Sequence, residues 1–124
     1  MYYLGIDVAK AKLDCCLLLD PLTLKTHHKS LPNTPESVTQ LLRWVTARIP
    51  ADAPWQAVME ATGVYHEAFA LALHDAGFPV VIANPAQIRK FADGLAIRSK
   101  TDRLDSVVLA RFGHERKPNT WTPP

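Results

Sequence analysis

Four carboxylates have the residue types and spacing that could support chemistry. Asp7 lies near the end of one apolar segment, and Glu60 lies near the end of another. Asp102 and Asp105 are three residues apart, so in a helix they share one face. Carboxylate oxygens suit Mg²⁺ and Mn²⁺, and two such ions about 3.5–4 Å apart can activate an attacking oxygen and stabilise a leaving oxygen in phosphodiester transfer. We therefore expect one site for two ions where these four side chains converge.

Each of these carboxylates also has a purely structural interpretation. Asp7 could simply end a strand, and Glu60 could cap the backbone behind it. Acids such as Asp102 are favoured in the first turn of any helix by about 0.3–1 kcal/mol. A charged group at the end of a core strand is costly to bury unless it is paired or bound to metal. The chemical interpretation therefore depends on a fold that brings the four residues together.

The positions of apolar residues, glycines and prolines predict the elements that carry these acids. Three early segments are rich in strand-forming residues and are joined by short connections, which favours an antiparallel meander. A helix with Thr34 as its N-cap follows, and later segments alternate between strand and helix. The expected strands are Tyr2–Val8, Lys12–Leu19, Leu24–Leu31, Trp55–Ala61 and Phe78–Ala83, and the expected later helices are Val64–Ala76, Pro85–Ala92 and Asp102–Arg116.

This order of elements predicts an α/β chain with the ribonuclease H-like fold. Its sheet is mixed, with three antiparallel strands followed by two parallel ones, and helices flank it. In such a sheet, ligands bind at strand ends beside a topological switch, so Asp7 and Glu60 converge if their strands are neighbours. Tyr65 lies on the apolar stripe of its expected helix and is predicted to be a core residue, whereas His66 is predicted to lie on the surface.

The composition and charge exclude several classes of protein. With 124 residues, of which 48% are hydrophobic and 21% charged, the chain has the profile of a single soluble domain. No apolar run approaches the roughly 18 residues of a membrane span, no signal peptide is expected, and the Cys and His residues lack zinc-ligand spacing. Residues 85–124 hold eight Lys or Arg against four acids, which indicates a basic surface that could face phosphate. We expect a cytoplasmic protein with no membrane partner.

Four short motifs occur in order along nearly the whole chain. They are Gly5-Ile6-Asp7-Val8-Ala9-Lys10, Met59-Glu60-Ala61-Thr62-Gly63-Val64-Tyr65, Asn84-Pro85 and Lys100-Thr101-Asp102-Arg103-Leu104-Asp105. Each is a weak signal alone, but the ordered set is specific. With these motifs the chain resembles the N-terminal domain of the DEDD transposases of insertion-sequence family one hundred and ten. That family is related to the Piv site-specific invertase, and its catalytic domain resembles the RuvC Holliday-junction resolvase.

The resemblance implies which residues act and in what reaction. The four acids of the family correspond to Asp7, Glu60, Asp102 and Asp105, and Ser106 stands where an alanine is usual. The implied function is that of the N-terminal catalytic domain of a DNA transposase or recombinase, which cleaves and transfers DNA strands with Mg²⁺ or Mn²⁺, two ions in all. The implied division is a RuvC-like domain at residues 1–117 and a linker at 118–124 toward an absent C-terminal transposase domain. The isolated chain is then expected to be weakly active or inactive.

The resemblance also implies partners and a location. They are DNA, at the element ends and at the target, a structured guide RNA, and further copies of the chain in a dimer or tetramer. The protein is expected to act at the nucleoid, in a prokaryotic cytoplasm. Basic side chains near the acids are candidate contacts to the nucleic-acid backbone, which would position it without reading its sequence. These candidates are Lys10, Lys12, Arg98, Lys100 and Arg103, and Trp121 is expected to be exposed in the linker.

Three other functions remain open from the sequence. A sugar-kinase or actin-like ATPase fragment also begins with a Gly-Ile-Asp strand, but such proteins cradle phosphate in a glycine-rich turn, and residues 9–12 here contain no glycine. A RuvC-like junction resolvase or an RNA–DNA hybrid nuclease would use the same acids on a branched or hybrid substrate. A non-catalytic module that binds nucleic acid or protein would need no metal at all.

Overall fold

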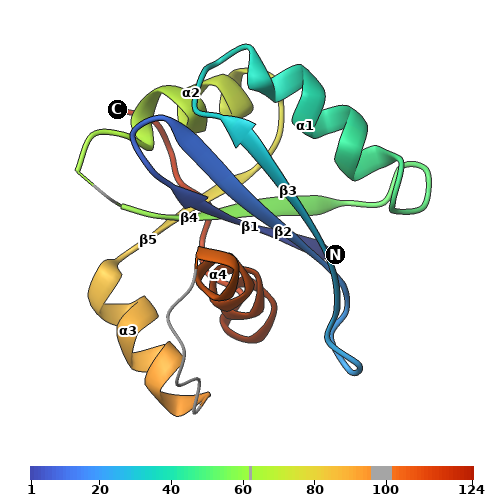
Figure 1. Ribbon diagram of the computed structural model, residues 1–124, viewed down its shortest axis with the longest axis vertical. Helices are drawn as coiled ribbons and strands as arrows, with labels where there is room; N and C mark the ends of the chain where they lie inside the picture. The colour runs from blue at the N-terminus through green and yellow to red at the C-terminus, as the bar shows by residue number, and fades with distance from the viewer. Residues whose placement is uncertain (62, 96–101) are drawn as a thin grey trace.

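The computed structural model describes residues 1–61, 63–95 and 102–124, with side chains from residue 105 onward in the last range. Figure 1 shows a sheet with helices on both faces. The elements follow the predicted order of three strands, a helix, a strand, a helix, a strand and two helices. They are β1 Tyr2–Val8, β2 Lys12–Asp20, β3 Lys25–Pro32, α1 Ser37–Thr46, β4 Trp55–Glu60, α2 Glu67–Asp75, β5 Val80–Ala83, α3 Pro85–Gly94 and α4 Asp102–Arg116.

The sheet confirms the predicted mixed topology. Its strand order is β3-β2-β1-β4-β5, with β1–β2 and β2–β3 antiparallel and with β1–β4 and β4–β5 parallel. The strands β1 and β4 are therefore neighbours, although two strands and a helix separate them in the chain. Because they are parallel, their carboxyl ends meet at the same edge of the sheet.

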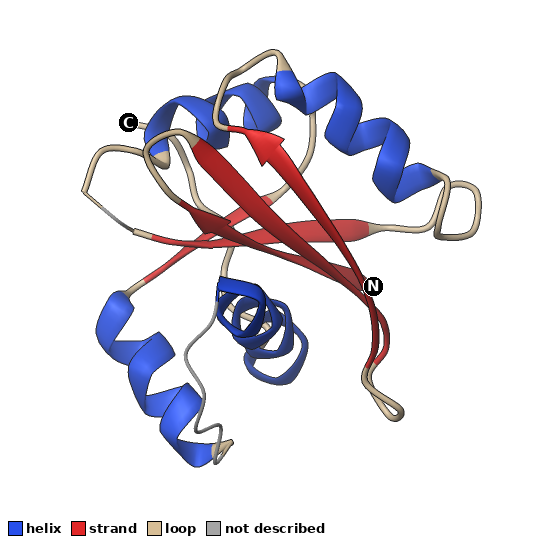
Figure 2. Ribbon diagram, in the orientation of Figure 1, coloured by secondary structure: helices blue, strands red, loops and turns tan. Residues whose placement is uncertain are grey.

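Alternation along β1 divides the molecule into two layers of packing. Leu4, Ile6 and Val8 belong to the core formed with α1 and α2, whereas Tyr3 belongs to a second core on the other face. Figure 2 shows α1 and α2 together on one side of the sheet, and α3 and α4 on the other. Asp7 shares the parity of Tyr3, so it projects toward the α4 side.

Helix α4 packs unusually close to β1 at Gly5. A Cβ atom built on Gly5 would overlap the carbonyl oxygen of Ser106, and it would lie 2.6 Å from the backbone nitrogen of Ala110. Further along the helix, a Cβ on Gly113 would lie 2.6 Å from Cδ1 of Tyr3 and 2.7 Å from a Val58 methyl group. Gly5 allows the backbones of β1 and α4 to approach each other directly, whereas Gly113 makes room for side chains of β1 and β4. The approach at Gly5 positions the N-terminal half of α4 above the end of β1.

Two helices begin later than the sequence predicts. Helix α1 begins at Ser37 after an N-cap at Glu36 that makes no side-chain cap. The predicted cap at Thr34 was wrong, because the Thr34 hydroxyl lies 3.3 Å from the Ser37 hydroxyl instead of capping the helix. Helix α2 begins at Glu67 and not at residue 64. As a result Tyr65 lies in a turn and is 45% exposed, so its predicted core position was wrong.

The segment after α4 crosses the edge of the sheet. The backbone N–H of Trp121 donates to the carbonyl of Val80 at 2.6 Å, which places this segment beside the edge strand β5. The indole is half-buried against the α1/α2 core and meets the His74 ring edge to face at 6.2 Å. Trp121 therefore packs against the core, and the prediction that it is exposed in a linker was wrong. Within the described residues, no helix is both long and apolar enough to cross a membrane.

Candidate metal centre at the carboxyl ends of β1 and β4

Asp7 and Glu60 occupy equivalent positions on neighbouring strands. In the parallel register Gly5 lies opposite Val58 and Ile6 lies opposite Met59, and Asp7 and Glu60 are the next residue of each strand. Residues that face each other across a parallel pair project to the same side of the sheet, here the side covered by α4. Both side chains are half-buried. The predicted convergence of the two strand ends is therefore present.

Asp105 lies close enough to these strand ends to act on Glu60. Burial raises the pKa of the Glu60 carboxyl, the negative charge of Asp105 raises it further, and the Arg89 guanidinium opposes both effects. Asp105 itself is exposed on α4, one residue before buried Ser106, which touches β1 at Gly5. The packing of α4 on β1 thus brings a third predicted acid to the same end of the sheet.

Asp102 is only partly described. It begins α4, one turn before Asp105, but its side chain lies outside the described residues. Within the described part of the chain, no three Asp, Glu, His or Cys side chains are already grouped to hold a metal ion. Asp7, Glu60 and Asp105 therefore lie at one end of the sheet, but their side chains do not form a three-ligand metal site as they stand.

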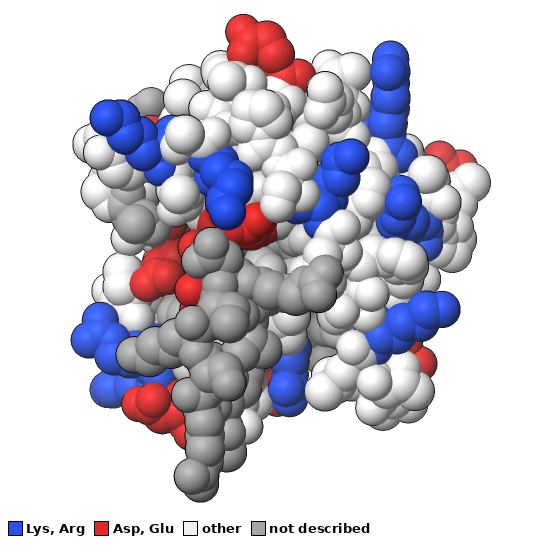
Figure 3. Space-filling model, viewed as in Figure 1, with Lys and Arg blue, Asp and Glu red and all other residues white. Residues whose placement is uncertain are grey.

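The predicted nucleic-acid contacts are described only in part. Lys10 is exposed beside the end of β1, and the Lys12 ammonium lies 3.5 Å from the Asp14 carboxylate. Arg98 and Lys100 lie outside the described residues, as does the side chain of Arg103. Figure 3, in the orientation of Figure 1, shows Asp and Glu side chains near the middle of this face with Lys and Arg side chains around them.

Comparison with known proteins identifies the family of this chain. The family model described as a transposase, of the DEDD type of insertion-sequence family one hundred and ten, matches residues 4–124. The chain belongs to this DEDD transposase family. Two pilin gene-inverting proteins are similar to it, one from Moraxella lacunata at 33% identity and one from Moraxella bovis at 32%. Each alignment covers 98% of this chain and 37% of the relative, so the chain spans little more than a third of these curated relatives.

Solved structures confirm the fold of this DEDD transposase chain. RuvC from T. thermophilus in complex with a Holliday junction superposes with a TM-score of 0.60 at 18% identity, over 97% of this chain and 98% of that chain. A second structure of Thermus thermophilus RuvC gives a TM-score of 0.61 with the same identity and coverage. The ribonuclease H-like, RuvC-like prediction is confirmed.

Sequence reasoning missed Asp14, a further carboxylate beside Asp7. The two residues are directly opposite each other in the β1–β2 ladder and therefore share the α4 side of the sheet. Asp14 accepts a hydrogen bond from the Ser30 hydroxyl at 2.7 Å, and its other oxygen faces the Lys12 ammonium. Alternation within β2 could have indicated which side Asp14 faces. Its pairing with Asp7 required the register.

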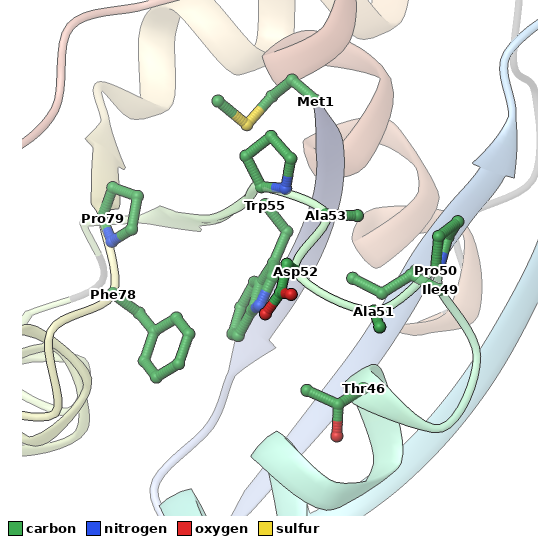
Figure 4. Close-up of a pocket in the computed structure, with 11 residues that line it drawn as sticks. Met1, Thr46, Ile49, Pro50, Ala51, Asp52, Ala53, Trp55, Phe78 and Pro79 are labelled. Carbon is green, nitrogen blue, oxygen red and sulfur yellow. The ribbon is translucent and has the colours of Figure 1, made fainter.

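An apolar pocket lies away from these carboxylates. Its volume is about 430 Å³, and it opens at the amino ends of the parallel strands, opposite to the end where Asp7 and Glu60 lie. Figure 4 shows the rings of Trp55 and Phe78 beside it, and these rings stack with centroids 4.8 Å apart. Asp52 is the one carboxylate among the residues that line it.

His66 is buried, with 9% of its surface exposed at the start of α2, so the prediction that it lies on the surface was wrong.

Proposed function

We propose that this chain is the catalytic domain of a DNA transposase or recombinase, in which Asp7, Glu60, Asp102 and Asp105 hold divalent metal for cleavage and transfer of DNA strands. The observation that carries the proposal is that three of these acids, Asp7, Glu60 and Asp105, lie at the same end of the sheet, where β1, β4 and α4 come together. Family membership supports the reaction class, because the family model that matches residues 4–124 is described as a transposase of the DEDD type.

The residues present fit a magnesium or manganese site. The donors are carboxylate oxygens, which both ions prefer, and two of them repel each other, since the negative charge of Asp105 raises the pKa of Glu60. A bound divalent cation would favour the ionised form of Glu60 and offset the repulsion between these two carboxylates. Two bound ions would supply an activated attacking oxygen and a stabilised leaving oxygen.

Each acid has its own role in holding the metal. Asp7 and Glu60 present half-buried carboxylates from rigid neighbouring strands, so their separation is set by the sheet. Asp102 and Asp105 come from the first turns of α4, whose distance from the sheet is set by the contact at Gly5. Because the ligands come from separate elements, any change in how α4 packs on β1 should alter metal affinity.

The proposed substrate is DNA, and exposed lysines beside the acids are its proposed backbone contacts. Lys10 and Lys12 project near the end of β1, and Arg98, Lys100 and Arg103 precede Asp105 in the chain. Phosphate contacts of this kind position a nucleic acid and weaken as salt rises. Membership of the family also supports a structured guide RNA and a dimer or tetramer of the full-length protein as parts of the proposal.

The experiment is a Mn²⁺ titration of the ¹⁵N-labelled chain, followed by paramagnetic broadening of its backbone amide signals. We expect broadening to begin at amides around Asp7, Glu60 and Asp105 and to be competed by excess Mg²⁺. Asp7→Asn should abolish this pattern, whereas Asp52→Asn, at the far end of the sheet, should leave it unchanged. Broadening that spreads evenly over surface acids, or that survives in Asp7→Asn, would reject the metal site and favour a nucleic-acid-binding module without metal.

A further inference from the structure

Asn33 connects two loops that leave the proposed metal site. Its side-chain amide nitrogen donates two hydrogen bonds, one to the carbonyl of Ala9 at 2.8 Å and one to the carbonyl of Tyr65 at 2.9 Å. Ala9 follows Asp7 by two residues in the turn between β1 and β2. Tyr65 follows Glu60 by five residues in the segment between β4 and α2. One amide group therefore joins the segments that extend beyond both of these strands.

Asn33 is itself held in place by its own backbone. Its backbone N–H donates to the carbonyl of Ala11 at 3.0 Å, so the main chain and the side chain of Asn33 bind the β1–β2 turn at Ala11 and at Ala9. On the preceding side Pro32 pairs with Lys12 in the sheet. The carbonyl of Pro32 accepts a hydrogen bond from the buried Ser37 hydroxyl at 2.7 Å, which ties this corner to the start of α1. The amide thus extends from an anchored corner and not from a free loop.

The chemistry of the contact favours asparagine. Two carbonyl oxygens from different segments need two N–H donors on one short side chain, and the Asn amide supplies both. Aspartate has the same shape but only acceptors when ionised, and serine or threonine supplies a single donor. Asn33 is half-buried as a residue, but both hydrogen bonds are exposed to solvent, so water would take the place of the lost donors if the side chain were removed.

We infer that Asn33 is a positioning residue of the metal centre, which holds the turn after Asp7 and the segment after Glu60 at a set separation. The sheet hydrogen bonds fix β1 against β4 up to Ile6 and Met59, and Asp7 and Glu60 lie just beyond that last pair. The Asn33 amide continues the connection past the strand ends. Its consequence for metal binding rests on the proposed function, but the bridge between the two loops does not.

The first test uses the metal-free chain. Asn33→Ala removes both donors, and Asn33→Asp keeps the shape while replacing the donors with acceptors. In each variant we expect amide signals to shift at both 9–11 and 63–66, and amide exchange at both segments to speed up. Asn119→Ala, which removes an exposed amide, is the matched control and should shift neither segment. A response confined to one segment, or to neither, would overturn the bridge.

The second test measures Mn²⁺ affinity of the same variants at a temperature where their spectra show a folded chain. Loss of a residue that orients metal ligands typically weakens affinity 10–100-fold, and we expect about tenfold or more for both Asn33 variants. The result for Asn33→Asp is the sharper one, because an added negative charge would otherwise strengthen cation binding. Wild-type affinity in folded variants would assign Asn33 a purely stabilising role and overturn the inference. Absence of selective Mn²⁺ broadening in the wild-type chain would instead reject the proposed function, and with it this positioning role, while leaving the bridge to stand or fall on the metal-free test.

Discussion

Replacement of Gly5 by alanine should move α4 away from β1 and weaken the metal site together with the fold. The new Cβ would overlap the Ser106 carbonyl oxygen and lie 2.6 Å from the Ala110 nitrogen and 3.0 Å from the Leu109 Cβ. Two of these three atoms belong to the helix backbone, so no side-chain rotation relieves the overlap and the helix must shift as a body. Overpacking of this kind costs about 1–3 kcal/mol, which for a chain of this length lowers Tm by about 4–12 °C.

The control for this prediction is the same substitution at Gly94. A Cβ there meets nothing within 4 Å, and Gly94 is an exposed residue of helix α3. Since alanine is favoured over glycine in helices by up to about 1 kcal/mol, Gly94→Ala should leave Tm unchanged or raise it. Thermal unfolding by circular dichroism and Mn²⁺ affinity of the folded chain are the two measurements. A Gly5→Ala chain with the Tm and Mn²⁺ affinity of the wild type would refute the close approach of α4 and its role in placing Asp105.

Three further variants test separate parts of the structure. Glu60→Gln should stabilise the metal-free chain at neutral pH. The pKa of Glu60 in the folded state is raised above its ordinary 4.5, so the wild-type chain loses stability as pH rises from 4.5 through the folded-state pKa. The neutral Gln side chain does not titrate and avoids this loss. Urea denaturation across this pH range should show the advantage growing with pH, and a constant or reversed difference would contradict it. Asp7→Asn should abolish recombination by the full-length protein without changing its Tm. Recombination that persists in this variant would show that Asp7 takes no part in the mechanism. Trp121→Ala should lower the free energy of unfolding by about 1–2 kcal/mol in urea denaturation, less than the roughly 3–5 kcal/mol lost with a fully buried Trp, because the indole is only half-buried. The Mn²⁺ affinity should not change, because Trp121 packs on the face of the sheet opposite α4. A change in affinity would show that the segment around Trp121 reaches the site.

The elements that form the centre of the fold were predictable because their signals are local. The strand Tyr2–Val8 and the helix Asp102–Arg116 have the bounds that the sequence predicts. Apolar runs bounded by turn residues identify a buried strand without any knowledge of its neighbours. The order of elements then restricts the topologies that can follow, and the neighbouring, parallel placement of β1 and β4 is among its consequences. The two acids at the ends of these strands could thus be paired from the amino-acid sequence alone.

The errors occur where a local pattern competed with tertiary packing. The apolar stripe that includes Tyr65 extends past the true start of α2, because Gly63 adopts a positive φ of 58° and residues 63–66 form turns. Tyr65 then projects outward while its carbonyl is held by Asn33, and His66 takes the buried place. Periodicity cannot register a contact with a residue far away in the chain, so the helix start and both side-chain positions were wrong.

Asp14 and Asn33 were missed for a related physical reason. Their importance comes from long-range partners: Asp14 lies opposite Asp7 only in the observed register, and Asn33 reaches Ala9 and Tyr65 only after β3 has paired with β2. A shift of one residue in either ladder would turn these side chains to the other face of the sheet. The acids that would bind metal are therefore readable from local sequence, whereas the residues that would set their spacing depend on register. Variants at Gly5 and Asn33, which change no charge when replaced by alanine, can separate that spacing from the charge of the ligands themselves.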